Sequence, residues 1–261
     1  KVIVDVQVNK KDKVKINRIH LTGNSVFSDK KMKGTLFKNG VLNKIHERGT
    51  IASWFRSKKF VESKYKESKE NLYTKYGEMG YRDAVILADS VVPSSEDGVD
   101  IYLHIEEGQK YYIRNIEWVG NTLFPTDALN EILHVKKGDV YNQKLLEERL
   151  TSDPDAVGNL YYNNGYVFYR LNRVETNVVG DSVDLEMRIV EGPQARISHV
   201  NIVGNDRVYE NVVRRELRNK PGDLFSKEAL ERSFREIGSL GHFNPENINP
   251  DIKPDDVNGT V

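Results

Sequence analysis

The fold of this chain is decided by a short run at residues 113–121, which reads Ile-Arg-Asn-Ile-Glu-Trp-Val-Gly-Asn. Related runs stand at 16–24 (Ile-Asn-Arg-Ile-His-Leu-Thr-Gly-Asn) and 197–205 (Ile-Ser-His-Val-Asn-Ile-Val-Gly-Asn). Each has the apolar residues of a strand, and the Gly-Asn pairs begin at 23, 120 and 204, so they are 97 and 84 residues apart. Self-similarity at a nearly constant period indicates a chain built from repeated structural units.

A second signal stands before two of these runs, a strict alternation of apolar and polar residues that ends in Glu-Gly. It covers 99–108 (Val-Asp-Ile-Tyr-Leu-His-Ile-Glu-Glu-Gly) and 183–192 (Val-Asp-Leu-Glu-Met-Arg-Ile-Val-Glu-Gly). Alternation with a period of two is typical of a half-buried strand. Residues 2–8 alternate in the same way, so we expect residues 1–11 to be the last strand of a preceding repeat.

Two helical patterns and one further strand lie between each Gly-Asn and the following Glu-Gly. In the second repeat, helical spacing of apolar residues begins after Thr126-Asp127, and a second helical pattern ends at Asn164-Gly165. The order predicts an α+β fold of tandem βααββ domains, each a three-stranded mixed sheet with two helices packed on one face. The predicted domains are 12–110, with an insertion around Asn39–Phe60, then 111–194, and 195–261, which lacks its last strand.

Composition and charge exclude several classes of protein. The 39 basic and 39 acidic residues give a formal net charge of zero, whereas binding to nucleic-acid phosphates needs a basic excess on one surface. The chain has no cysteine, which excludes disulfides, thiolate catalysis and cysteine-ligated metals. No apolar run approaches the roughly 18 to 20 residues of a membrane-spanning helix.

No group of residues points to catalysis, a cofactor or a metal. Glu106 and Glu107 are neighbours on a predicted strand, so they point to opposite faces and do not form a pair of catalytic carboxylates. The histidines are scattered without the spacing of a metal site, which favours surface placement (residues 20, 46, 104, 134, 199 and 242). The sequence therefore predicts a binding or structural protein, not an enzyme.

The features that recur along the repeats resemble those of the POTRA domain. They are Gly-Asn after the first strand in all three repeats, Gly-Asp between the helices of the second and third, and Gly-Tyr after the second helix and Glu-Gly at the end of the first and second. The resemblance covers essentially the whole chain. It is strongest to the third, fourth and fifth domains of the periplasmic arm of BamA-like outer-membrane β-barrel assembly factors. The third repeat departs from the pattern, because His242 replaces the tyrosine and prolines follow at 245, 250 and 254, so its middle strand should be short or at an edge.

The resemblance implies that the middle strand of each domain lies at a sheet edge, where an extended client chain can add itself. The candidate edges are Arg82–Val91 and Val167–Val174. The candidate client-binding residues on them are Ala84, Val85, Ile86, Leu87, Val167, Phe168, Tyr169, Arg170 and Leu171. The alternative is that Val167, Tyr169 and Leu171 only pack under the helices, while Arg170 and Arg173 guard an edge that meets no client.

A local basic excess lies at Arg56–Lys75, which holds seven Lys or Arg against three Glu. Lys64, Lys66 and Lys69 are the candidate basic patch for an acidic partner or for anionic lipid head groups. The apolar residues of this stretch fit one helical face, so the alternative is a packed helix with a solvated basic side.

From the resemblance we expect a chaperone-like arm on the periplasmic side of the bacterial outer membrane. Its expected partners are unfolded outer-membrane proteins, bound by β-augmentation, and accessory lipoproteins of the assembly complex, with no nucleic acid. Membrane contact is expected only through a barrel that would follow Val261. Two alternatives remain, the arm of a related protein-secretion transporter and a passive spacer that touches no client.

Overall fold

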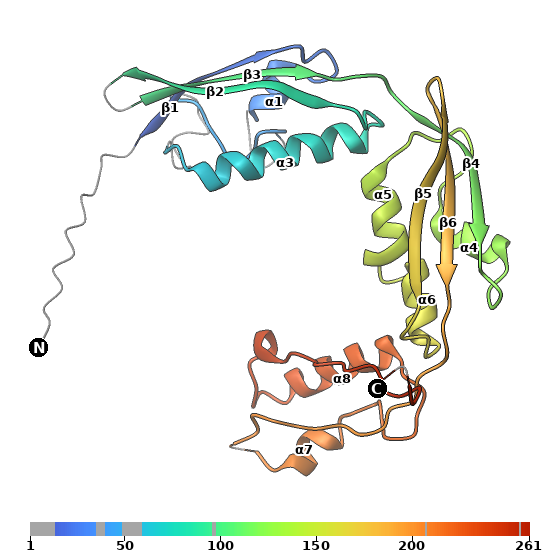
Figure 1. Cartoon of the computed structure of the whole chain (residues 1–261). Coiled ribbons are helices and arrows are strands. Elements are labelled where there is room, and N and C mark those ends of the chain that lie inside the picture. Colours follow the sequence, from blue (N-terminus) through green and yellow to red (C-terminus); the bar gives the residue numbers. More distant parts are fainter. Residues whose placement is uncertain (1–13, 35–39, 49–58, 96–97, 207, 256) are drawn as a thin grey trace, which may run out of the picture. The chain divides into compact units, whose positions relative to one another are not determined.

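The computed structural model describes residues 14–34, 40–48, 59–95, 98–206, 208–255 and 257–261 (Figure 1). The chain divides into two compact units, one of residues 1–112 and 140–144 and the other of residues 113–139 and 145–261. The strand expected over residues 1–11 lies outside the described residues, as does part of the expected insertion.

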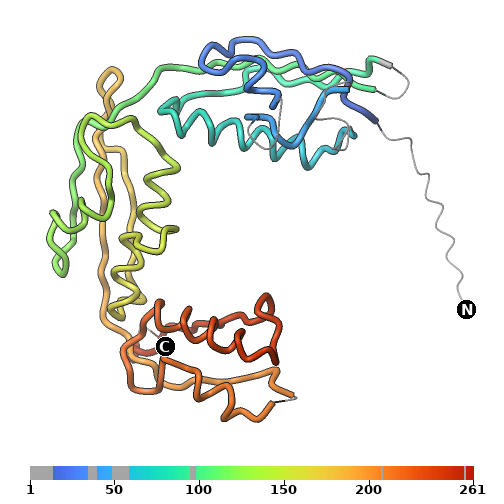
Figure 2. The backbone as a smooth tube through the Cα atoms, turned by 180° about the vertical axis from the view of Figure 1, so that it is seen from behind, coloured from blue at the N-terminus to red at the C-terminus, as the bar shows by residue number. Residues whose placement is uncertain are grey.

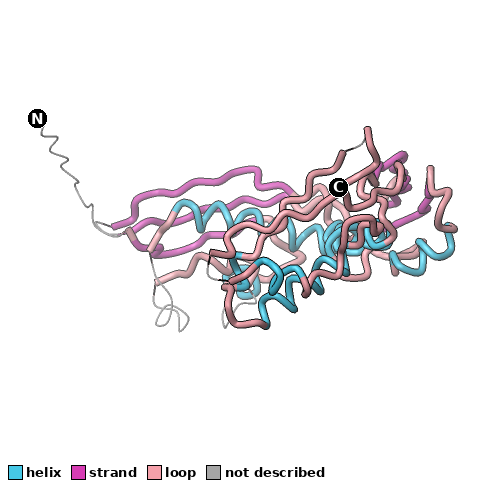
Figure 3. Tube along the Cα trace, turned by 90° about the horizontal axis from the view of Figure 1, so that it is seen from below, coloured by secondary structure: helices cyan, strands magenta, loops and turns pink. Residues whose placement is uncertain are grey.

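The first unit contains a mixed three-stranded sheet covered by helices (Figure 1). The last strand of the repeat is the central one, since it pairs in parallel with the first strand and antiparallel with the middle strand. Figure 1 shows the helices of this unit on one side of its sheet, and Figure 3, coloured by secondary structure, shows the same strands and helices from below. Its elements are β1 (Lys15–Thr22), α1 (Asp29–Lys33), α3 (Glu62–Glu78), β2 (Val85–Ser95) and β3 (Gly98–Glu106).

The alternation in β3 places its apolar residues on the helix-covered face, as predicted. Ile101, Leu103 and Ile105 are at most 2% exposed, whereas Tyr102 between them is 44% exposed. Leu72 and Tyr76 of α3 are fully buried in the same core cluster. Burial of these side chains is the main favourable contribution to the stability of such a small domain.

The second unit contains a sheet of the same strand order, β4-β6-β5, with the last strand again in the centre. Val183, Leu185 and Met187 of β6 are buried, as are Leu129 and Val157 of the helices, so the helices cover one face. The α+β prediction is thus confirmed. The elements are β4 (Tyr112–Val119), α4 (Thr126–Leu133), α5 (Gln143–Glu147), the π-helical turn η1 (Glu148–Ser152), α6 (Val157–Asn163), β5 (Arg170–Val179) and β6 (Ser182–Val190).

The third repeat, orange to red in Figure 2, belongs to the second unit. Its described part contains α7 (Glu210–Arg214), α8 (Lys227–Ser239) and the 3-10 turn η2 (Pro245–Asn247), packed around Val213, Leu217 and Ile237. The strand predicted at 197–205 is not formed, so that prediction is wrong.

The physical reason lies in the strand order. In both sheets the last strand is central, and the matching residues of the third repeat begin only at Thr260. Arg196 makes a parallel bridge to Thr260, and Asp255 makes an antiparallel one, which reproduces the start of the same sheet. Beyond these bridges and the hydrogen bond from Ser198 N to Val261 O, residues 199–205 have no ladder partner among the residues that the structure describes, and backbone pairing is what holds a strand.

Candidate functional site

Strand β2 forms one edge of the first sheet, because β3 lies between it and β1. Residues 85–92 read Val-Ile-Leu-Ala-Asp-Ser-Val-Val, an apolar run with the single charge of Asp89. Pro93 ends the run, and proline is tolerated here because an edge strand does not need every N–H for its ladder. The run combines high strand propensity with low charge, the combination that favours addition of another strand.

The predicted residues of this edge divide between two environments. Val85 and Leu87 are exposed, at 40% and 56%, whereas Ile86 and Ala84 pack against the core. Ala84 lies just before the strand, and Leu87 stands where the register shifts between Ile86 and Ala88. The exposed aliphatic side chains therefore lie beside an open backbone edge.

The single charge of the run faces α3. The carboxylate of Asp89 accepts hydrogen bonds from Tyr65 Oη and from Lys69 Nζ, the latter at 2.5 Å. Lys69 Nζ also lies 4.9 Å from the centre of the Tyr65 ring. Burial, together with the hydrogen bond to Asp89, raises the pKa of Tyr65, so its hydroxyl stays a proton donor.

The candidate basic patch is thereby divided. Lys69 is held by Asp89 in an ion pair, while Lys64 and Lys66 are exposed on α3. Sequence reasoning did not foresee the pairing, because Lys69 and Asp89 lie 20 residues apart and on different elements.

The opposite edge of each sheet is partly closed by the loop between the helices. The carbonyl oxygen of Ile16 accepts from Arg48 N at 2.9 Å, and that of Ile113 accepts from Gly138 N at 2.7 Å. The third repeat does the same, with Ile197 O accepting from Gly222 N at 2.7 Å. The chain thus covers the beginning of β1 and of β4, which leaves the middle strand of each of these two sheets as the longer open edge.

The second candidate edge begins later than predicted. Strand β5 starts at Arg170, so Arg170 and Leu171 lie in it but Val167, Phe168 and Tyr169 lie in the preceding turn, and their assignment to the strand is wrong. Val167 N bonds to Gly165 O and Tyr169 N to Tyr166 O. The Tyr169 ring stacks on Tyr161 at 4.2 Å, which holds the segment against α6.

The two edges differ in charge. Strand β5 carries Arg170, Arg173 and Glu175 within its first six residues. Arg173 and Glu175 pair with Met187 and Leu185, whose side chains are buried, so the two charged residues stand on the helix side of the edge. Inward charges of this kind protect an edge strand against unwanted pairing.

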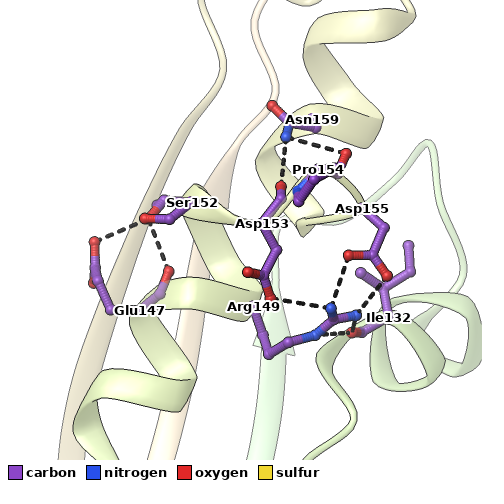
Figure 4. A network of polar contacts seen from close by, with 9 residues as sticks. Ile132, Glu147, Arg149, Ser152, Asp153, Pro154, Asp155 and Asn159 are labelled. Atoms are coloured by element: carbon purple, nitrogen blue, oxygen red, sulfur yellow. Dashed lines mark hydrogen bonds and ion pairs between the residues drawn. The ribbon is translucent and has the colours of Figure 1, made fainter. Parts of the chain in front are cut away.

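A buried arginine that the sequence did not single out holds the helices of the second unit together (Figure 4). The guanidinium of Arg149 donates to the carbonyl oxygen of Ile132, at 2.9 Å from Nε, and to the carboxylates of Asp153 and Asp155. Its side chain is 10% exposed. With every guanidinium nitrogen engaged, Arg149 joins the end of α4 to the π-helical turn and acts as a structural clamp.

The described part of the chain contains no group of three or more His, Asp or Glu that could hold a metal ion. Among the described helices, none combines the length and apolar character needed to cross a membrane.

The comparison with protein families agrees with this architecture. The POTRA model, described as "Surface antigen variable number repeat", matches residues 14–108, 111–192 and 195–261. The chain belongs to the POTRA family. The three matches follow one another along nearly the whole chain, so the POTRA domains are tandem repeats.

The similar proteins place these POTRA domains in a BamA-like region. A putative outer membrane protein assembly factor of Treponema pallidum is 26% identical over 259 residues, which are 97% of this chain. Outer membrane protein assembly factor BamA of Neisseria meningitidis serogroup B is also 26% identical over 97% of the chain. The chain spans 29% and 31% of the length of these two relatives.

A solved structure confirms the fold. The crystal structure of Haemophilus influenzae BamA POTRA3-5 matches with a TM-score of 0.74 and 15% identity, over 98% of this chain and 97% of that chain. The POTRA region here thus has the fold of a third-to-fifth POTRA segment.

Proposed function

We propose that these POTRA domains belong to the periplasmic arm of an outer-membrane protein assembly factor and receive unfolded β-barrel precursors by strand addition. The observation that carries the proposal is β2, an open edge with an apolar run and one neutralised charge. An extended precursor segment gains main-chain hydrogen bonds there with little dependence on its side chains. The names of the relatives supply the process, outer-membrane protein assembly.

The two edges contribute unequally in this proposal. Val85, Ile86 and Leu87 of β2, with Ala84 before them, form the principal docking edge. Arg170 and Leu171 of β5 form a weaker one, since the charges on that strand oppose pairing. The start of β5 is supported by Val167, Phe168 and Tyr169, which provide no strand backbone for an added strand to pair with.

Accessory lipoproteins of the assembly complex are proposed as further partners, on the periplasmic side of the outer membrane. The exposed Lys64 and Lys66 on α3 are the proposed contacts for an acidic surface. No catalytic step is proposed, since strand addition changes no covalent bond.

Photocrosslinking tests the docking edge. A photoreactive residue replaces Leu87 in the complete 261-residue chain, and a urea-denatured outer-membrane β-barrel protein is diluted into it. The matched control replaces Val203, which is 90% exposed but lies on no strand. We expect capture from position 87 at several times the yield from 203. Equal yields would contradict strand addition at β2 and favour a passive spacer.

A further inference from the structure

The charge on the open edge is the feature that most needs an explanation. Acidic and basic residues usually guard edge strands against pairing, and Asp89 stands in the middle of the apolar run of β2. Its position opposite the buried Leu103 turns its side chain toward the helix-covered face. An inward charge there would be expected to oppose an added strand.

Side chains of α3 neutralise the charge of Asp89. Lys69 and Tyr65 stand one helical turn apart, and both donate to the Asp89 carboxylate. The two ionised side chains remain partly open to solvent, at 27% for Lys69 and 29% for Asp89. Lys69 and Tyr65 therefore lie on the side of α3 that faces β2, whereas Asn71 donates from α3 to the carbonyl oxygen of Val41.

Strand addition changes the surroundings of this pair. A new strand beside β2 would cover the partly exposed side chains of Asp89 and Lys69, and it would remove water from the Asp89 carboxylate. Desolvation of a carboxylate is costly unless hydrogen-bond donors already satisfy it. Lys69 and Tyr65 supply those donors before any client arrives.

We propose that Lys69 determines whether β2 accepts an added strand, because it neutralises an aspartate that would otherwise guard the edge. The inference rests on the proposed docking function and adds a positioning residue to it. It also defines the occupant, an extended segment whose α3-facing side chains are uncharged, since the charges at this point are already paired. A charged side chain in that position would lack a partner on docking.

Binding of a defined peptide tests the inference. The probe is a fluorescent peptide of about ten residues in which valine and threonine alternate, the length of a barrel strand. Its anisotropy is measured with the 261-residue chain and with the variants Lys69→Met and Lys30→Met. Lys30 is the matched control, since it is an exposed lysine on α1 of the same unit and lies outside the candidate basic patch. We expect Lys69→Met to weaken binding about tenfold, the effect of leaving the Asp89 carboxylate without one of its two donors, and Lys30→Met to leave binding unchanged.

Two further variants separate edge neutralisation from a loss of structure. Lys69→Arg retains the charge and should bind the peptide as the unaltered chain does. Lys69→Met combined with Asp89→Asn removes both charges and should restore binding to within about threefold. Unchanged binding by Lys69→Met, or no rescue by Asp89→Asn, overturns the role of Lys69.

The unaltered chain distinguishes this inference from the function on which it rests. One outcome is that the peptide binds but the same peptide with alternate amide nitrogens methylated does not. Docking then occurs through the backbone, and the variants test the role of Lys69. If both peptides bind equally, or neither binds, strand addition itself is overturned and the role of Lys69 falls with it.

Discussion

Tyr76 Oη donates a hydrogen bond to Glu107 Oε1 at 2.6 Å and so ties the end of α3 to the end of β3. The second repeat has the same contact, Tyr161 Oη to Glu191 Oε1 at 3.0 Å. In both repeats the carboxylate also accepts from the backbone after the Gly-Asn pair, at Val26 N and Thr122 N. The Glu-Gly signature is thus a clasp that joins three elements. In the third repeat, the tyrosine position four residues before the glycine is Ile237.

Removal of the tyrosine hydroxyl should weaken this clasp. Tyr76→Phe leaves the Glu107 carboxylate, in a residue that is 7% exposed, without one of its donors. We expect a loss of about 1–3 kcal/mol in the free energy of unfolding of the first unit. Chemical denaturation measures it. Tyr73→Phe, on the same helix but 37% exposed, is the matched control. Equal effects of the two changes would contradict the clasp.

The clasps should also make stability depend on pH. Burial by itself would raise the pKa of Glu107, but hydrogen bonds from Ser25, Tyr76 and Val26 N outweigh it and lower that pKa below 4.5. The pKa of Glu191 is lowered for the same reason. A lowered folded-state pKa stabilises the fold above the unfolded pKa, and this contribution is lost as pH falls through the folded value.

We therefore expect the free energy of unfolding to fall as the pH is lowered below about 4.5. Glu107→Gln should flatten the acid side of the profile for the first unit. Denaturation curves at a series of pH values measure the slope. An unchanged slope in the variant would mean that Glu107 does not carry the effect.

The buried guanidinium predicts a large effect in the second unit. Arg149→Met leaves Ile132 O without its donor and leaves the carboxylates of Asp153 and Asp155 without this partner, and we expect a loss of about 1–3 kcal/mol, mainly from the carbonyl oxygen. The control is Arg188→Met, since Arg188 is 54% exposed and pairs only with Glu186 among the contacts described. That surface pair should contribute little to stability, because solvent screens it. Thermal unfolding of both variants decides whether the network in Figure 4 is structural.

Substitution of the glycine in a Gly-Asn pair should lower the stability of a repeat most where the central strand of its sheet is formed. Gly120 has a φ of +89°, and a Cβ there would overlap the carbonyl oxygen of Ile189 in β6. Gly204 has a φ of +81°, but nothing lies within 4 Å of its Cβ position. Gly120→Ala should therefore cost several times the roughly 1 kcal/mol of backbone strain expected for Gly204→Ala. Similar losses in denaturation experiments would contradict the close approach to β6.

The order of elements could be predicted because β3 and β6 carry their own signal. Alternation at 99–105 and 183–189 reports which side chains face the core, and this depends only on neighbouring residues. The start of β5 could not be predicted, since Val167–Tyr169 has the β-branched and aromatic composition of a strand but is held in a turn by the stacking of Tyr169 on Tyr161. Residues 198–205 likewise have strand composition, and whether they form a strand depends on a partner elsewhere in the chain.

The candidate site, like the fold, has one part that the sequence could predict and one part that it could not. The position of the middle strand at an edge followed from the resemblance, and β2 lies there. The neutralisation of Asp89 did not, because it joins β2 to α3 through side chains 20 residues apart. A lysine on a helix and an aspartate on a strand give no local signal of their pairing.

Hydrogen exchange of the β2 amides tests the central claim most directly. The exchange rates of residues 85–92 are measured in the complete chain, with and without the alternating valine–threonine peptide, and residues 115–119 of β4 serve as the internal reference. The account predicts slower exchange at alternate amides of β2 on addition of the peptide, with β4 unchanged, because only amides that point outward gain new acceptors. Unchanged exchange in β2 at a saturating peptide concentration would contradict strand addition at this edge.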